Sequence, residues 1–151
     1  MLRLPITTPS LVVIDSASTT KDQVIRELAA RLQTEGRVTD VDSFVADVVR
    51  REEILATGIQ GGIGIPHARS ASVTTPSVAV ATSATGIPFG SPDGPAHLIF
   101  LIAAPTDTDD SHLQILAAIA RQVTRDDFRN ALQTATEAGF IADIMSKEVQ
   151  K

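Results

Sequence analysis

Residues 97–103 constrain the fold of this sequence more than any other stretch, because they are almost continuously apolar over the length of one strand. Such a run is typical of a strand that is buried in the middle of a sheet. The longest apolar run of the chain, residues 98–104, is far shorter than the roughly 20 residues that cross a bilayer. The sequence therefore predicts a central strand here and no transmembrane helix.

Helix-like and strand-like patterns alternate along the rest of the chain. Apolar runs at 11–14 and 77–82 predict two strands, residues 57–68 fit loops and short strands, and residues 86–95 fit a hairpin or a surface loop. Caps and apolar stripes predict helices from Thr19 or Thr20 to Gly36, from Asp40 or Asp42 to residues 50–53, from Asp109, Asp110 or Ser111 onward, and over 125–134 and 136–147. This alternation predicts a three-layer α/β fold, with residues 1–151 forming one domain.

The composition excludes several classes of function. The chain has no cysteine, so disulfides, thiolate zinc sites and cysteine nucleophiles are ruled out. Aromatic residues make up 3%, the net charge is −5, and no cluster of lysine and arginine stands out, which argues against nucleic-acid binding. The first residues lack the apolar core of a signal peptide, so a cytoplasmic protein is expected.

His67 is the first candidate functional residue, because it follows a glycine-rich run and comes directly after Pro66. Glycine allows close approach of the backbone, and proline fixes the backbone just before the imidazole. A histidine on such a platform can present its ring to another macromolecule. The pattern favours a residue that is reached and modified, such as a phosphoryl acceptor. The alternative is a loop histidine without a function.

His112 is expected to lie near His67, because it opens a helix after the central strand. In an open α/β sheet, functional groups gather at the carboxyl ends of strands. Two neighbouring imidazoles could bind a metal, shuttle a proton, or accept and stabilise phosphate. A metal site is disfavoured, since no third ligand has a recognisable spacing. His97 opens the central strand and is interpreted as structural or exposed.

Other phosphate-binding motifs do not fit this sequence. No helix follows the glycines at 61–64, as a dinucleotide-binding site requires, and no P-loop is present. Phosphate is therefore expected to come from a phosphoprotein and not from ATP. Arg51, beside Glu52 and Glu53, fits a solvated ion pair. A guanidinium beside an acceptor histidine would instead neutralise charge on a transferring phosphoryl group.

Two groups of motifs carry a family resemblance. The first comprises residues 51–53, 57–59 and 64–68, and the second comprises 98–105 and 112–116, with the turn 93–94 before it. Together they resemble the enzyme IIA domain of the phosphoenolpyruvate-dependent sugar phosphotransferase system, in its fructose/mannitol class, and most of all fructose-specific IIA. The resemblance extends over about residues 11–144. It implies a mixed β-sheet of about five strands, with helices on both faces.

The resemblance also implies a function. His67 matches the histidine that receives phosphate from the phosphocarrier protein HPr and passes it to enzyme IIB, which serves the membrane component IIC in sugar uptake. His112 and Arg51 match the other active-site residues. Two departures are noted: Gly64 stands where alanine is common, which is a mild change, and His97 stands where lysine is common.

Phosphoryl transfer needs positioning and charge stabilisation more than covalent chemistry by other groups. Arg51, His112, the hydroxyl of Thr57 and loop amides, with Gly64 as a candidate, are expected to hold the phosphoryl oxygens. No metal or other cofactor is required by this mechanism. An exposed, largely apolar docking face around the histidine is expected, because two partners must reach it in turn.

Three hypotheses follow. The first is a component of sugar transport, which the fructose-like second group of motifs and the absence of an attached regulator domain favour. The second is a regulatory module, of the nitrogen-related branch or of a transcription regulator, in which phosphorylation of His67 is a signal. The third is a binding protein that has lost phosphorylation, and it is disfavoured because His67, His112 and Arg51 are all present.

Overall fold

The structure, a computed structural model, describes residues 5–106 and 111–150. Its strands are β1 (Val12–Val13), β2 (Gly58–Ile59), β3 (Ile63–Gly64), β4 (His67–Ser70), β5 (Ser77–Ile87) and β6 (Ala96–Pro105). Its helices are the 3-10 turn η1 (Pro9–Leu11) and the α-helices α1 (Lys21–Thr34), α2 (Val41–Ile54), α3 (Ser111–Gln122), α4 (Asp126–Gln133) and α5 (Ala138–Glu148).

The strands form one mixed sheet in the order β1-β5-β6-β3-β2, and β4 also pairs with β6. β5 and β6 are antiparallel, whereas β3 and β4 both run parallel to β6. β3 pairs with Leu98 and Ile99, and β4 pairs with residues 102–105, so the two short strands follow each other along one side of β6. The gap between β3 and β4 therefore lies beside the middle of the central strand.

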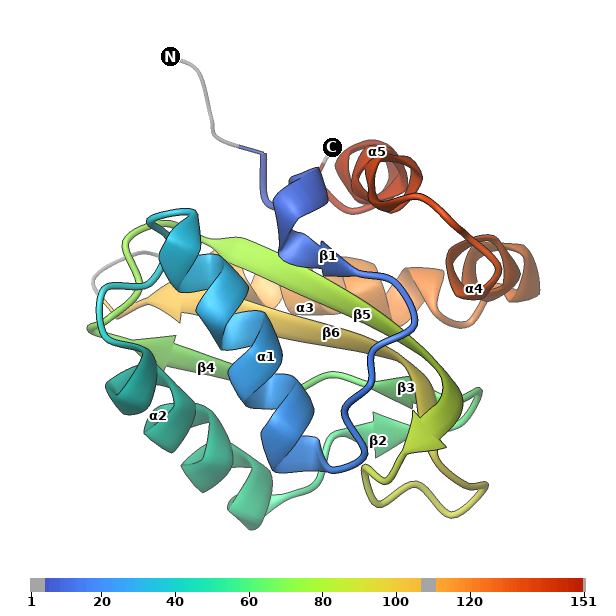
Figure 1. Cartoon of the computed structure of the whole chain (residues 1–151), viewed down its shortest axis with the longest axis horizontal. Coiled ribbons are helices and arrows are strands. Elements are labelled where there is room, and N and C mark those ends of the chain that lie inside the picture. Colours follow the sequence, from blue (N-terminus) through green and yellow to red (C-terminus); the bar gives the residue numbers. More distant parts are fainter. Residues whose placement is uncertain (1–4, 107–110, 151) are drawn as a thin grey trace.

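Helices cover both faces of the sheet. Ile99, Leu101 and Ala103 of β6 belong to one buried cluster, together with residues of α1 and α2. Alternate residues of the same strand, Leu98 and Phe100 among them, belong to a second cluster with residues of α3, α4 and α5. Figure 1 shows α1 and α2 on the near side of the sheet and α3 behind it. The predicted three-layer α/β fold with a mixed sheet is confirmed.

Local sequence rules account for several boundaries. The side chains of Thr20 and Asp40 cap α1 and α2, as predicted. The candidates Asp109 and Asp110 for the cap of α3 lie outside the described residues. β5 is longer than the expected 77–82, because it continues through a register shift into a hairpin with β6. Leu11 lies in the 3-10 turn and not in a strand.

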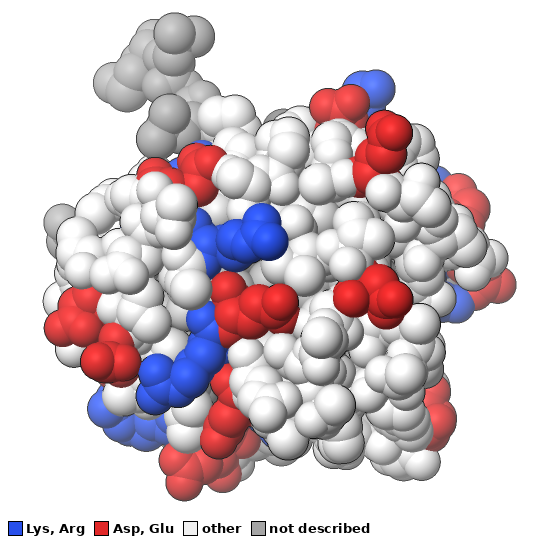
Figure 2. All heavy atoms as spheres, in the orientation of Figure 1, with Lys and Arg blue, Asp and Glu red and all other residues white. Residues whose placement is uncertain are grey.

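No helix within the described ranges has the length and apolar composition needed to cross a membrane. Figure 2 shows acidic and basic side chains intermingled over the face that α1 and α2 form. On this face no large area carries charge of one sign, and a polyanion such as nucleic acid would find no continuous basic surface there.

The cap of α2 gives a first testable prediction. Asp40 accepts hydrogen bonds from the backbone N–H and the hydroxyl of Ser43, at 3.1 Å and 3.0 Å, and the backbone bond is the main reason why the pKa of Asp40 lies below its usual 3.8. The ionised form is favoured by folding, so its contribution to stability is present above pH 3.8 and is lost as the pH falls through the lower folded value. Replacing Asp40 by alanine should lower the melting temperature by about 2–4 °C at pH 7.

Thermal unfolding of both proteins at pH 7 and at about pH 2 checks this prediction, because the difference should shrink at the acid pH as the carboxylate is protonated. A difference of the same size at both pH values would contradict it.

Candidate active site

His67 is the first residue of β4, and its ring has a defined orientation. Its Nδ1 lies 2.8 Å from the carbonyl oxygen of Ile65. A carbonyl can only accept, so in the neutral ring Nδ1 carries the proton and Nε2 keeps a lone pair. The intervening Pro66 is buried, and its carbonyl accepts a hydrogen bond of 3.0 Å from the backbone N–H of Ile102. The histidine is thus fixed to the central strand, half-buried, with Nε2 as its nucleophilic atom.

The register of β4 shows which face of the sheet carries His67. His67 pairs with Ile102, and the next residue, Ala68, pairs with Ala103. Ile102 belongs to the cluster with α3, whereas Ala68 and Ala103 pack with α1 and α2. Because neighbouring residues in parallel register point to the same face, His67 lies on the α3 side.

His112 is the second residue of α3, on that same side of the sheet, although its imidazole lies outside the described part of the chain. The position of His67 differs from the expected carboxyl edge of the sheet. His67 begins β4 directly after the gap that follows β3, level with Ile102, and β4 continues past it to the end of β6 at Pro105. Since α3 packs against β6, the start of α3 remains on the face that carries the histidine.

Arg51 lies in the last turn of α2, where its Nη1 donates a 3.1 Å hydrogen bond to the carbonyl of Leu55. The expected ion pair with Glu52 or Glu53 does not form within the described residues. Among the residues that the structure describes, no hydrogen bond joins Arg51 to His67. A guanidinium has five N–H donors, so most of them remain available to a ligand or a partner.

The structure uses Thr57 and Gly64 differently from the expectation. The hydroxyl of Thr57 donates to the carboxylate of Glu52, so its proton is not directed at a phosphoryl group here. Gly64 is buried in β3, and a Cβ added to it would lie 2.8 Å from Cγ of the Phe89 ring. Gly64 therefore makes room for an aromatic side chain.

His97 does not join the candidate site. It lies five residues before Ile102 on β6, and its Nδ1 lies 2.8 Å from the carbonyl oxygen of Ser83. Its ring lies close to Gly62 and Gly86, where a Cβ would meet ring atoms at 3.3 Å and 3.0 Å. The interpretation of His97 as a structural residue agrees with these contacts.

Glu52 is the residue that the sequence interpretation missed. Its charged neighbours in the sequence predict a solvated position, yet only 6% of Glu52 is exposed, and its carboxylate pairs with Lys21 at 2.8 Å. Its spacing in α2 contained the signal. The buried residues Phe44 and Val48 are four positions apart, and Glu52 follows Val48 by four more positions on the same face of the helix.

The match to known proteins decides which family this site belongs to. Residues 5–148 match the family described as the phosphoenolpyruvate-dependent sugar phosphotransferase system, EIIA 2. The chain belongs to this family. It is 36% identical to the fructose-specific EIIA component of the phosphotransferase system of Haloferax volcanii, over 96% of this chain and 95% of that protein. The EIIA 2 assignment therefore covers almost the whole chain.

Two further relatives of this EIIA 2 protein are informative. It is 34% identical to the fructose-specific EIIABC component of the phosphotransferase system of Bacillus subtilis. The match covers 93% of this chain and 22% of that longer protein. The solved structure of the nitrogen regulatory protein IIA-Ntr from Neisseria meningitidis is similar with a TM-score of 0.83 and 27% identity, covering 93% of this chain and 96% of that one. The first relative is similar over one part of a multidomain protein, and the second over a complete fold.

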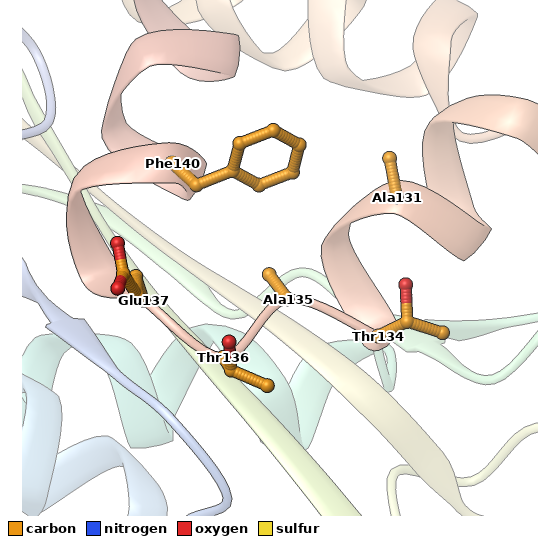
Figure 3. Close-up of a pocket in the computed structure, with 6 residues that line it drawn as sticks. All are labelled: Ala131, Thr134, Ala135, Thr136, Glu137 and Phe140. Carbon is orange, nitrogen blue, oxygen red and sulfur yellow. The ribbon is translucent and has the colours of Figure 1, made fainter.

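A hollow of about 330 Å³ lies elsewhere, between α4 and α5 (Figure 3). Small and hydroxyl side chains line it, with Glu137 and the half-exposed ring of Phe140. It contains no histidine or arginine. The hollow thus lacks the groups that phosphoryl transfer needs, and it is not the candidate active site.

Proposed function

We propose that this EIIA protein accepts a phosphoryl group on Nε2 of His67 from phosphorylated HPr and passes it to enzyme IIB, for the uptake of a sugar. The observation that carries the proposal is the bond from Nδ1 of His67 to the carbonyl of Ile65. It leaves the Nε2 lone pair free to attack phosphorus while the bond from phosphorus to HPr breaks and its electron pair leaves with HPr. The Nδ1 proton stays on the ring, where the Ile65 carbonyl stabilises the positive charge that the ring gains.

Arg51 and His112 are proposed to stabilise the phosphoryl oxygens during both transfers. Arg51 supports this role through its available N–H donors. His112 supports it through its place at the start of α3, on the face that carries His67. A cationic or hydrogen-bonding group fixed near the transferring oxygens stabilises the charge that they carry. No metal is needed for this mechanism.

The surface at the end of α2 supports docking of protein partners. Ile54 is 77% exposed and Leu55 is 67% exposed, and both lie between Arg51 and Thr57 in the sequence. Exposed apolar side chains of this kind are frequent in protein–protein interfaces. We propose that HPr and enzyme IIB use this surface in turn, as small and transient contacts. Such partners place the protein in the cytoplasm.

Fructose is the proposed sugar, because the two fructose-specific relatives share 34–36% identity with this chain. The Bacillus relative carries EIIA, EIIB and EIIC in its name, which supports enzyme IIB as the next acceptor. The alternative is a regulatory role, and the similarity to IIA-Ntr favours it. In that case phosphorylation of His67 would be a signal and not a step of transport.

Transfer of phosphate in two stages tests the proposal. The protein is mixed with phosphoenolpyruvate, enzyme I and HPr, and intact mass is measured. We expect one acid-labile phosphoryl group. Addition of a fructose-specific enzyme IIB should then remove it and leave it on IIB. A protein that stays unphosphorylated beside a working control EIIA would refute the proposal, and a phosphoprotein that no sugar-specific IIB can discharge would favour the regulatory alternative.

A further inference from the structure

The carboxylate of Glu52 is buried and uses both of its oxygens. Oε2 accepts hydrogen bonds from Nζ of Lys21 at 2.8 Å and from the backbone N–H of Thr57 at 3.2 Å. Oε1 accepts from the hydroxyl of Thr57. Three donors from two segments therefore converge on one carboxylate, between the start of α1 and the segment that follows α2.

A continuous series of hydrogen bonds connects Glu52 to the ring of His67. Glu52 holds both the backbone and the side chain of Thr57. The carbonyl of Thr57 accepts a hydrogen bond of 3.3 Å from the backbone N–H of Ile65. The carbonyl of Ile65 in turn lies 2.8 Å from Nδ1 of His67. The position of the Ile65 carbonyl, which sets the tautomer of His67, thus depends on a residue that Glu52 fixes.

Lys21 connects the same carboxylate to Phe89. Its ammonium lies 5.3 Å from the centre of the Phe89 ring, within range of a cation–π interaction. The carbonyl of Phe89 accepts a 3.1 Å hydrogen bond from the N–H of Gly58, the residue after Thr57. The ion pair therefore fixes the strand β2 both through Thr57 and through Phe89.

Stability alone gives little reason to keep this ion pair. The Glu52 side chain is only 4% exposed, whereas that of Lys21 is 27% exposed. Burial of a carboxylate is costly, and an apolar replacement of a buried ion pair is often neutral or stabilising. The cost is easier to explain when the charges hold a reactive group in place, because an error of about 1 Å in position can cost about 100-fold in rate.

We propose that Glu52, held by Lys21 and bound to Thr57, is a positioning residue for phosphoryl transfer at His67. This role rests on the proposed function. Glu52 keeps the Ile65 carbonyl in place, so that the neutral ring carries its proton on Nδ1. When this support is lost, part of the population carries the proton on Nε2, and that form has no lone pair with which to attack phosphorus.

Thr57→Val tests the role, since it removes the hydroxyl donor and keeps the size and branching of the side chain. Two quantities are measured: the rate of phosphate acceptance from HPr, and the tautomer of His67 from the 15N shifts of its ring in the unphosphorylated protein at about pH 8.5. We expect the rate to fall about 10–100-fold and the share of Nε2-protonated rings to rise. Thr57→Ser, which restores the hydroxyl, should recover both quantities.

Glu52→Gln should shift the tautomer in the same direction, and Glu53→Gln, which changes the exposed neighbouring carboxylate, is the matched control that should change neither quantity. A slower Thr57→Val with an unchanged tautomer would overturn the positioning role and assign Thr57 to direct contact with the phosphoryl group. Unchanged rate and tautomer would also overturn it. The tautomer of His67 is measured without any phosphate. A wild-type protein that accepts no phosphoryl group would refute the proposed function, and the tautomer would still show whether Glu52 positions the ring of His67.

Discussion

Replacing His67 by alanine should abolish acceptance of phosphate from HPr. The Nε2 atom is the proposed nucleophile, and the hydroxyl of Thr57 is not free to take its place, because it already donates to Glu52. His67→Gln should be equally inactive, since an amide can donate to the Ile65 carbonyl but is not a nucleophile. We expect a loss of more than about 1,000-fold, measured by intact mass after incubation with phosphoenolpyruvate, enzyme I and HPr.

His97 is the matched control for this experiment, because it makes the same kind of bond. Its Nδ1 also lies 2.8 Å from a backbone carbonyl, and its side chain is also half-buried. His97→Gln should still accept one phosphoryl group. His112→Ala should accept one as well, at a lower rate, because His112 is assigned to stabilise charge and not to form the bond. A phosphoryl group on His67→Ala would move the acceptor to another residue and refute the proposed chemistry.

The central strand and the caps of α1 and α2 were predictable because each depends on neighbours within a few positions in the sequence. Thr20 and Asp40 act on the residues three positions later, and the apolar run of β6 is continuous in the chain. The sequence could not show that β3 and β4 share one side of β6. That arrangement depends on pairing with residues more than 30 positions away, and it determines where His67 lies.

The role of Glu52 shows the same limit at the level of a single side chain. Its neighbours in the sequence, Arg51 and Glu53, are both charged, which favours the interpretation as a solvated ion pair. Its partner is Lys21, 31 positions away, and only the packing of α1 beside α2 brings the two together. The apolar spacing of α2 was the one local sign that position 52 points inward.

Gly64 is a second residue whose meaning depends on a distant partner. Alanine at this position is expected from the family resemblance to be a mild change, yet the buried Phe89 ring occupies the space that a methyl group would need. Gly64 and Phe89 are 25 positions apart, so no local pattern connects them. The structure therefore predicts that the effect of alanine at 64 depends on the residue at 89.

Phe89→Ala should lower the free energy of unfolding by about 3–5 kcal/mol, because it opens a cavity where a fully buried ring packs. Gly64→Ala alone should cost about 1–3 kcal/mol, since its Cβ would lie 2.8 Å from Cγ of that ring. In the Phe89→Ala background the same change should instead recover about 1 kcal/mol, because the methyl group then fills part of the cavity and glycine is unfavourable inside a strand.

Urea unfolding of the four proteins measures this reversal of sign as a coupling free energy. Gly139→Ala is a suitable control, because a Cβ at that position meets nothing within 4 Å and should have the same effect with either residue at 89. If Gly64→Ala cost the same in both backgrounds, the ring would not be what excludes a side chain at 64. The glycine would then have to be explained by the backbone of β3, where Gly64 pairs with both Gly58 and Ile99.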